Sequence, residues 1–176
     1  MTVTLKDLTW DNHKKAETTA LMKSLLKNQI SETLYSQYLY VQYEIYANIE
    51  SRIKFETQGL NRAQLSLDDW QNTSQRIPSN LPALDKYTER LRTVDPHQLW
   101  AHVYLHYLAP LYGGQIIKRV IGQRFPTSRL DFDNPEACKM EIRPRLTVDL
   151  ADEANQAFES IIEIYDQLYQ SHQQHS

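Results

Sequence analysis

Apolar residues recur at intervals of three or four positions along almost the whole chain, and this spacing limits the fold more than any other feature. Only four of the 176 residues are glycine, and alternations of Val, Ile or Thr with polar residues are scarce. The spacing is typical of amphipathic helices, whereas alternation would indicate strands. A chain of this length fits one domain with its own core. We therefore expect an all-α, single-domain bundle of about seven or eight helices over residues 1–176, with a polar tail from about residue 170.

Candidate capping residues divide this pattern into helices. Ser, Thr, Asp or Asn before an apolar repeat, with or without a following Pro, marks a helix start. Such starts stand at Thr4, Ser31, Ser66, Asp95-Pro96, Asn134-Pro135 and about Asp149, and a further helix fits residues 82–91. We expect the first helix to run unbroken from Thr4 to Leu25, and the Asp95-Pro96 start to open a long helix that ends near Ile121.

Composition and charge exclude several classes of function. A net charge of −3 gives no signature of nucleic-acid binding. Cys138 is the only cysteine, which excludes an internal disulfide and a Cys-based zinc site. No apolar run approaches the roughly 18–20 residues that cross a bilayer, and the first residues, MTVTLKDLTW, lack the pattern of a secretory signal. We expect a cytoplasmic protein without a nucleic-acid or membrane partner.

The segment YLAPLYGGQII, residues 107–117, places Pro110, Gly113 and Gly114 inside an apolar helix pattern. Each glycine costs a helix on the order of 1 kcal/mol relative to alanine, and Pro110 removes the hydrogen bond to the carbonyl of His106. One interpretation is a kink or a close crossing of two helices. The other is a backbone that lies directly against a flat ligand, since glycine allows such an approach. The spacing alone leaves both open.

Histidines and tyrosines provide the candidate ligand contacts. His13 stands one helical turn before Glu17, and a carboxylate there can orient the second nitrogen of a metal-bound imidazole, although a lone helical histidine is more often packed or solvated. His102 and His106 are also one turn apart, but they lack the glutamate of an HExxH motif, so a structural or surface role is favoured. A tyrosine stripe indicates either a core face or an aromatic wall around a ligand: Tyr35, Tyr38, Tyr40, Tyr43 and Tyr46.

The segments HKKAETTALMKSLLKNQ and LWAHVYLHYLAPLYGGQIIKRVIGQR together resemble haem oxygenase sequences. In that family a proximal histidine begins an H-x-x-A-E motif, and a distal helix carries a glycine pair. The segment DEANQAFESIIEIYDQL is similar to the last helix of the family, and LNRAQLSLDDW is a fainter match to its middle region. The order and separation of these segments are more specific than any one of them. The resemblance implies a helical fold with haem between a proximal helix and a kinked distal helix.

The resemblance also implies roles for individual residues. His13 matches the axial ligand of the haem iron, Glu17 the glutamate beside it, and Gly113 and Gly114 the distal glycines over the haem. The remaining matches to haem contacts are the apolar Phe158 and the propionate-binding Lys6, Tyr104, Lys139 and Arg143. The chain departs from the family at three positions: Pro110 replaces an aspartate that orders water, His106 replaces an arginine, and Trp10 replaces a lysine.

The implied activity is the oxidative cleavage of haem b, which is both substrate and cofactor, to biliverdin, CO and Fe²⁺. It uses O₂ and electrons from a ferredoxin or a flavin reductase, for which the basic residues Lys118, Arg119 and Arg124 are a candidate docking site. Because Pro110 replaces the aspartate that orders water in the family, more than one function fits the sequence. Either water is organised by Tyr104, His106 or the carbonyl that Pro110 frees, or the chain binds haem for storage or sensing without cleaving it. A helical domain with another small ligand is the third interpretation.

Overall fold

The structure, a computed structural model, describes residues 2–174. Over this range the chain forms α-helices and short 3₁₀-helices and no strand, which confirms the expected all-α class. The α-helices are α1 (Leu5–Glu17), α2 (Ala20–Leu26), α3 (Glu32–Glu50), α4 (Ala63–Gln71), α5 (Pro82–Thr93), α6 (Leu99–Ile121), α7 (Pro135–Ile142) and α8 (Ala151–Gln174). The 3₁₀-helices are η1 (Ser128–Leu130), η2 (Arg143–Arg145) and η3 (Val148–Leu150).

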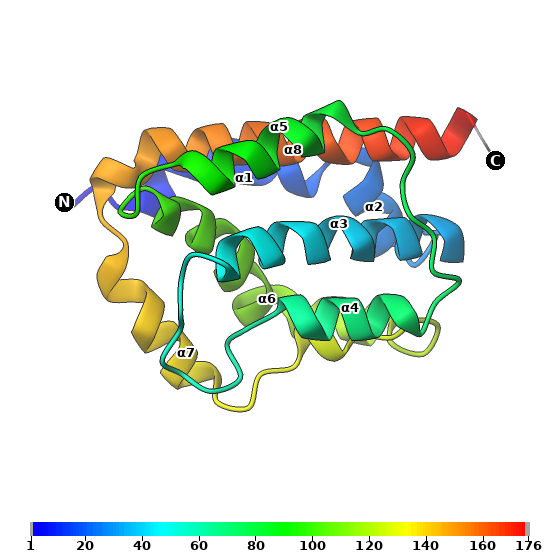
Figure 1. The fold of residues 1–176 in the computed structure, drawn as a ribbon, viewed down its shortest axis with the longest axis horizontal. Coiled ribbons are helices and arrows are strands. Elements are labelled where there is room, and N and C mark those ends of the chain that lie inside the picture. The colour runs from blue at the N-terminus through cyan, green and yellow to red at the C-terminus, as the bar shows by residue number, and fades with distance from the viewer. Residues whose placement is uncertain (1, 175–176) are drawn as a thin grey trace.

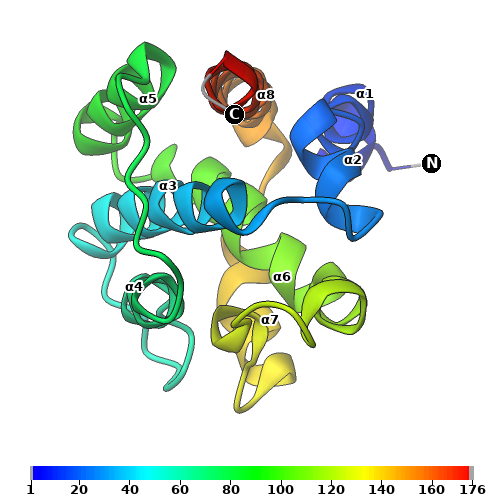
Figure 2. The ribbon, with the colours of Figure 1, turned by 90° about the vertical axis from the view of Figure 1, so that its right-hand side faces the viewer.

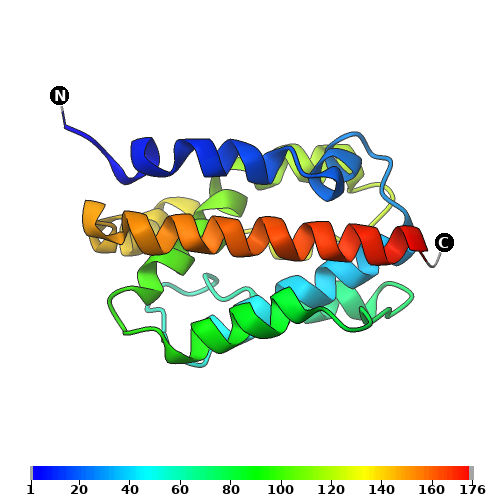
Figure 3. The same cartoon turned by 90° about the horizontal axis from the view of Figure 1, so that it is seen from above.

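The helices are stacked in three levels around α3 (Figures 1 and 2). The upper level holds α1, α8 and α5 side by side, with α8 in the middle (Figure 3). The lower level holds α4, α6 and α7. Because α3 is covered from both sides, most of its tyrosines and aliphatic residues are fully buried and join the main core. The amphipathic spacing of the sequence thus resolves into one continuous core, as expected for a single domain.

The first helix begins where the sequence predicts. The side chain of Thr4 accepts a hydrogen bond from the N–H of Asp7 at 3.2 Å, and the Asp7 carboxylate accepts one from the N–H of Thr4 at 3.0 Å. This reciprocal pair is a capping box, which satisfies two N–H groups that a helix start otherwise leaves unpaired.

The expected unbroken helix to Leu25 is wrong, because two adjacent threonines divide it. The Thr18 hydroxyl donates to the carbonyl of Lys14 at 3.1 Å, where α1 ends. The Thr19 side chain then accepts from the N–H of Met22 at 3.3 Å and caps α2. Threonine hydroxyls compete with the helix for backbone groups, and here they end one helix and begin the next.

Two further starts are confirmed by their caps. Ser31 accepts from the N–H of Leu34 at 3.1 Å at the start of α3, and Asn134 accepts from the N–H of Ala137 at 3.1 Å at the start of α7. The start expected at Ser66 is wrong, because this residue is buried within α4, which begins at Ala63.

The long helix α6 begins at Leu99, later than the Asp95-Pro96 signal predicts. The Asp95 carboxylate still acts as a cap, accepting from the N–H groups of His97 and Gln98 at 3.0 and 3.1 Å, but it caps a turn that precedes the helix. The last helix α8 likewise follows a 3₁₀ turn, η3, and begins two residues after Asp149. It continues to Gln174, so residues 170–174 of the expected polar tail are helical, whereas residues 175 and 176 lie outside the described range.

Pro110 lies inside α6, which continues through it and bends, so that its yellow-green second half runs in a different direction from its first half (Figure 1). Proline cannot donate to the carbonyl four residues before it, here that of His106. The hydroxyl of Tyr46 on α3 donates to this carbonyl at 2.7 Å. The carbonyl freed by Pro110 is therefore bonded to protein through one of its two lone pairs, and its role as a water anchor stays a prediction. None of the helices between residues 2 and 174 is long and apolar enough to cross a membrane.

Candidate functional site

A cavity of about 400 Å³ lies between α1 and α2 on one side and the second half of α6 on the other. Its walls are mostly aliphatic and aromatic. They come from α1 and α2 (His13, Ala16, Glu17, Met22, Leu26), α3 (Tyr38, Gln42, Tyr46), α6 (Leu105, His106, Ala109, Pro110, Gly113, Ile116, Ile117), η1 (Arg129, Leu130) and α8 (Phe158, Ile161, Tyr165). Concave, largely apolar pockets with a few polar groups are typical of small-molecule sites.

His13 enters this cavity from α1 and is held on several sides. Its Nε2 lies 2.7 Å from Oε1 of Glu17, one turn further along the helix. The ring stacks on Trp10, with centroids 5.5 Å apart, and faces Phe158 of α8 at 5.7 Å. Glu17 thus occupies one ring nitrogen and leaves Nδ1 available, which is the arrangement by which a carboxylate orients a metal-binding imidazole.

The two glycines of α6 have different surroundings. A Cβ added to Gly113 would meet no atom within 4 Å, and Gly113 lines the cavity. A Cβ added to Gly114 would lie 3.5 Å from the side chain of Leu130, in ordinary van der Waals contact, and Gly114 is buried against η1. The sequence resemblance implies that both glycines lie over a ligand. In the structure Gly113 lines the cavity, whereas Gly114 packs against Leu130.

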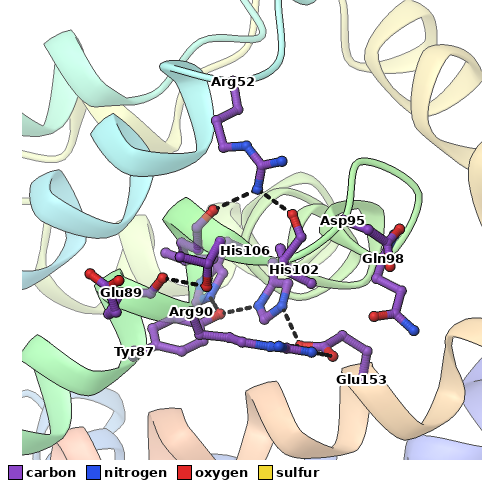
Figure 4. A network of polar contacts seen from close by, with 12 residues as sticks. Arg52, Tyr87, Glu89, Arg90, Asp95, Gln98, His102, His106 and Glu153 are labelled. Atoms are coloured by element: carbon purple, nitrogen blue, oxygen red, sulfur yellow. Dashed lines mark hydrogen bonds and ion pairs between the residues drawn. The ribbon is translucent and has the colours of Figure 1, made fainter.

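His106 of α6 also lines the cavity, and it is the end of a buried hydrogen-bond network (Figure 4). Its Nε2 lies 2.8 Å from the hydroxyl of Tyr87, which lies 2.7 Å from Nδ1 of His102. Nε2 of His102 lies 2.9 Å from the Glu153 carboxylate, to which Arg90 donates through Nε at 3.1 Å. The network therefore connects α6, α5 and α8. A surface role for His102 is wrong, because this side chain is 1% exposed.

The C-terminal end of α5 is anchored by Arg52, which lies in the turn that follows α3. Nη1 of Arg52 donates to the carbonyls of Leu91 and Val94 at 2.9 and 2.6 Å (Figure 4). These carbonyls have no intrahelical donor at a helix end, so the guanidinium both satisfies them and anchors the helix.

Burial and charge set the protonation of the two ends of this network. Burial, and the neighbouring His102, lower the pKa of His106 from 6.5 to about 3, so its ring is neutral at pH 7. Burial opposes ionisation of Glu153, but the hydrogen bonds from His102 and Arg90 outweigh it and lower its pKa from 4.5 to about 2. Glu153 is therefore a carboxylate and must accept the proton of His102 Nε2.

When the network carries no extra proton, each of its hydrogen bonds donates in the direction of Glu153. His102 donates from Nε2, so its Nδ1 accepts from the Tyr87 hydroxyl. The Tyr87 oxygen in turn accepts from Nε2 of His106. Nδ1 of His106, which has no partner in residues 2–174, is left unprotonated. His106 thus offers a hydrogen-bond acceptor at the cavity wall.

Four of the predicted contacts do not line the cavity. Lys6 lies over the ring of Trp10 at 5.6 Å, and the hydroxyl of Tyr104 lies 3.1 Å from the Thr9 hydroxyl. Lys139 is paired with Glu136 at 3.2 Å and lies over the ring of Tyr112, whose hydroxyl accepts from Arg143. The structure brings together the other seven: His13, Glu17, His106, Pro110, Gly113 and Phe158 at the cavity, with Gly114 behind it.

Sequence reasoning missed Tyr87, Glu153 and Arg129. Tyr87 and Glu153 lie on helices that no motif connects with His106. One sequence feature pointed to Glu153: it lies within DEANQAF, a segment that is similar to the family's last helix. That similarity alone does not connect Glu153 with His102 or His106. Arg129 follows a proline-containing turn and carries no motif at all.

The described residues contain no group of three or more His, Cys, Asp or Glu that could hold a metal ion. A single imidazole beside an apolar cavity instead suits a metal whose remaining ligands come from a cofactor, as in haem. His13 is the candidate for that ligand.

The chain is similar to known proteins in both sequence and fold. A family model described as heme oxygenase matches residues 1–140. The chain is 29% identical to rat heme oxygenase 1 over 93% of its own length and 27% identical to rat heme oxygenase 2 over 95% of it. It spans 70% and 65% of those relatives, respectively. The fold also matches the crystal structure of heme oxygenase-1 from the cyanobacterium Synechocystis in complex with heme, with a TM-score of 0.77 and 25% identity, covering 93% of this chain and 90% of that one.

Proposed function

The chain belongs to the haem oxygenase family, whose members are haem-degrading oxidoreductases, and we propose that it cleaves haem b to biliverdin, CO and Fe²⁺ in the cavity between α1 and α6. One observation carries the proposal. His13, oriented by Glu17, and Gly113, with open space in front of its Cα, line the same cavity from two helices. An imidazole on one wall and bare backbone on the other suit a flat macrocycle with a central metal.

Three further features of the cavity support haem as its ligand. Apart from the few polar groups described above, its walls are aliphatic and aromatic, which suits the faces of a porphyrin. Because residue 113 is glycine, the space that a Cβ would fill at this position is open to a ligand. Arg129 contributes a positive charge to the lining, which suits a ligand that carries carboxylates. When bound, haem supplies the iron that activates O₂ and the ring that is cleaved.

The chain's own contribution on the distal side is a proton held near the cavity. In the uncharged network Nδ1 of His106 accepts a hydrogen bond from water or ligand. One added proton reverses the two hydrogen bonds of Tyr87: Nδ1–H of His102 then donates to Tyr87, Tyr87 donates to Nε2 of His106, and His106 presents Nδ1–H, while His102 still donates to Glu153. The added charge is held on His102, next to a carboxylate. Release of the proton from His106 Nδ1 reverses the two bonds of Tyr87 again and leaves His102 neutral.

The proposed reaction also needs O₂ and an electron donor of the ferredoxin or flavin-reductase class. Of the basic residues predicted to dock the donor, Lys118 is paired with Asp131 at 2.6 Å, and Arg124 donates to Asn28. Arg119 lies on the same helix as Lys118 and makes no ion pair with a residue between 2 and 174. We therefore centre the docking site on Arg119.

Titration with haemin tests the axial assignment. The wild-type protein is expected to give the Soret band of histidine-bound haem, and His13→Ala should lose it. Added imidazole should restore the band, because the small residue leaves room for a free ligand. His97→Ala, which removes a surface histidine paired with Asp149, is the control and should bind as wild type does. An unchanged spectrum in His13→Ala would show that another residue binds the iron.

A further inference from the structure

The buried tyrosines differ in the group that accepts the hydrogen bond of their hydroxyl. Tyr46 donates to the backbone carbonyl of His106 at 2.7 Å. Tyr107, which is fully buried, donates to Oε2 of Glu50 at 2.7 Å. A backbone carbonyl accepts a hydrogen bond but does not take up its proton, whereas a carboxylate can do both. Tyr107 is thus a tyrosine that can give up its proton inside the core.

Glu50 is placed to take up that proton. Its carboxylate also accepts from the N–H of Arg62 at 2.7 Å and from the N–H of Ala63 at 3.2 Å, so it is fixed at the start of α4. Burial opposes its charge and raises the pKa of Glu50 above the ordinary value of 4.5. Glu50 therefore takes up a proton more readily than an exposed glutamate does. Once protonated, it donates the same hydrogen bond in reverse, so the oxygen of Tyr107 keeps its partner.

Aromatic rings connect Tyr107 with the cavity and with the surface. The ring of Tyr46, which lines the cavity, lies edge to face with that of Tyr107, with centroids 5.1 Å apart. The ring of Phe55 lies 5.0 Å from Tyr107 and 6.1 Å from Trp100, which is half-buried. Rings in such close contact allow an electron to pass between them. Tyr107 therefore lies in a series of rings that leads from the cavity to a surface tryptophan.

Tyr87 is the rival to Tyr107, because it donates to Nδ1 of His102, and an imidazole can also take up a proton. The ring contacts of Tyr87 within residues 2–174 are those with His102 and His106, at 5.4 and 5.8 Å. No aromatic series continues from Tyr87 to the surface in that part of the chain. Of the two tyrosines, Tyr107 therefore has both a proton acceptor and an onward path for an electron.

We propose that Tyr107 is a redox site, which returns an electron through Tyr46 to haem that an organic hydroperoxide has oxidised in the cavity. The hydroperoxide takes two electrons from the haem and, with two protons from solvent, is reduced to an alcohol and water as its O–O bond breaks. Tyr107 returns one of these electrons to the haem, its O–H bond breaks, and Glu50 takes the proton. The product is a neutral tyrosyl radical at Tyr107, bonded to protonated Glu50.

The inference rests on the proposed function, because it takes haem as the ligand of the cavity. It goes beyond that function, since the hydroperoxide oxidises the haem outside the cleavage reaction. Tyr107 has no part in cleavage itself. Its role is to remove an oxidising equivalent from the cavity, and so to spare the lining residues.

Electron paramagnetic resonance tests the proposal. The ferric haem complex of the purified protein is mixed with cumene hydroperoxide and frozen. We expect a tyrosyl radical signal in wild type, narrowed when the protein is made with ring-deuterated tyrosine, and loss of this signal in Tyr107→Phe. Glu50→Gln keeps an acceptor for the N–H groups of α4 but does not take up the proton, so it should lose the signal too. In wild type, the infrared band of a protonated carboxyl group should appear together with the radical.

The controls distinguish this inference from its rivals. Tyr35→Phe removes a buried hydroxyl that donates to the carbonyl of Pro126 at 2.8 Å, and it should keep the signal. The Soret band of each variant shows that it is folded and loaded, and Glu50→Gln covers the case in which Tyr107→Phe does not fold. A signal that persists in Tyr107→Phe and Glu50→Gln would overturn the proposal, as would a signal that only Tyr87→Phe removes.

Failure of the wild-type protein to bind haemin would overturn the proposed function and this inference together. Wild type that binds and cleaves haem, yet forms no tyrosyl radical with the hydroperoxide, would overturn the redox role of Tyr107 alone.

Discussion

The hydroxyl of Tyr46 donates to the backbone carbonyl of His106 at 2.7 Å, the carbonyl that Pro110 leaves without its helical donor. A tyrosine on α3 thus replaces a backbone hydrogen bond of α6, at the point where α6 bends beside the cavity. The arrangement explains how an internal proline is tolerated in a helix that lines the site.

Tyr46→Phe should therefore lower the free energy of unfolding by about 1–3 kcal/mol, because it leaves a buried carbonyl unpaired. Pro110→Ala restores an N–H that can reach the same carbonyl. In a protein that already carries Pro110→Ala, the cost of Tyr46→Phe should be smaller. Urea unfolding of the two single variants and the double variant measures this coupling. Equal costs in both backgrounds would show that Tyr46 does not substitute for the missing donor.

Alanine substitutions distinguish the two glycines of α6. Either substitution should stabilise the free protein by up to about 1 kcal/mol, because alanine favours the helix and neither added methyl group clashes. Gly113→Ala should weaken haemin binding, since its methyl group enters the cavity, whereas Gly114→Ala should leave binding unchanged. Thermal unfolding and haemin titration check the two effects. Weaker binding in Gly114→Ala alone would reverse the assignment of the two residues.

Acid should destabilise the fold through both ends of the buried network. The pKa of Glu153 is about 2 in the folded protein, compared with an ordinary value of 4.5 that applies to the unfolded chain. Its contribution to the free energy of unfolding is therefore complete above pH 4.5 and is lost as the pH falls toward 2. The shift corresponds to about 3 kcal/mol. His106, with a pKa of about 3 against 6.5, adds a loss that begins below pH 6.5, because the unfolded chain takes up the proton first.

Urea unfolding between pH 7 and pH 3 measures this dependence. Glu153→Gln should be less stable than wild type at pH 7 and should lose less stability on acidification. Glu159→Gln changes an exposed carboxylate on the same helix and is the control, with a profile parallel to that of wild type. Parallel profiles for wild type and Glu153→Gln would contradict the lowered pKa.

Tyr87→Phe should interrupt proton transfer between His102 and His106 while leaving the cavity lining intact. We expect haemin binding within a factor of about two of wild type and cleavage of bound haem slowed by about 100-fold. Tyr107→Phe removes another fully buried hydroxyl of the same region, one that donates to Glu50, and should not slow cleavage. Single-turnover absorbance traces compare the variants, and equal rates for Tyr87→Phe and wild type would remove the network from the reaction.

Local patterns in the sequence were sufficient for the helical class and for the caps at Thr4, Ser31 and Asn134, because each cap involves residues only three apart. They failed at Thr18 and Thr19, where apolar spacing continues across a break made by side-chain hydrogen bonds. The late start of α6 has a similar cause, since Asp95 caps a turn and the helix follows it.

At the site, His13 and Glu17 could be found from the sequence because they are one helical turn apart. The Tyr87–His102–Glu153 contacts could not, since they join residues 15 and 51 positions apart on three helices. The different positions of Gly113 and Gly114 depend on where Leu130 packs, which no periodicity specifies. Arg129 is recognisable only once the cavity is seen, because it joins the lining from a turn that carries no motif.

We propose that this chain cleaves the haem it binds, with Pro110 in the distal helix and His106 at the cavity wall. The most direct measurement adds one equivalent of haemin to the purified protein, supplies ferredoxin, its reductase and NADPH under air, and follows the visible spectrum together with release of CO. We expect the Soret band to disappear as a biliverdin band and one equivalent of CO appear. A Soret band that persists under reduction in air, without CO, would contradict cleavage and identify a haem-binding protein of the same fold.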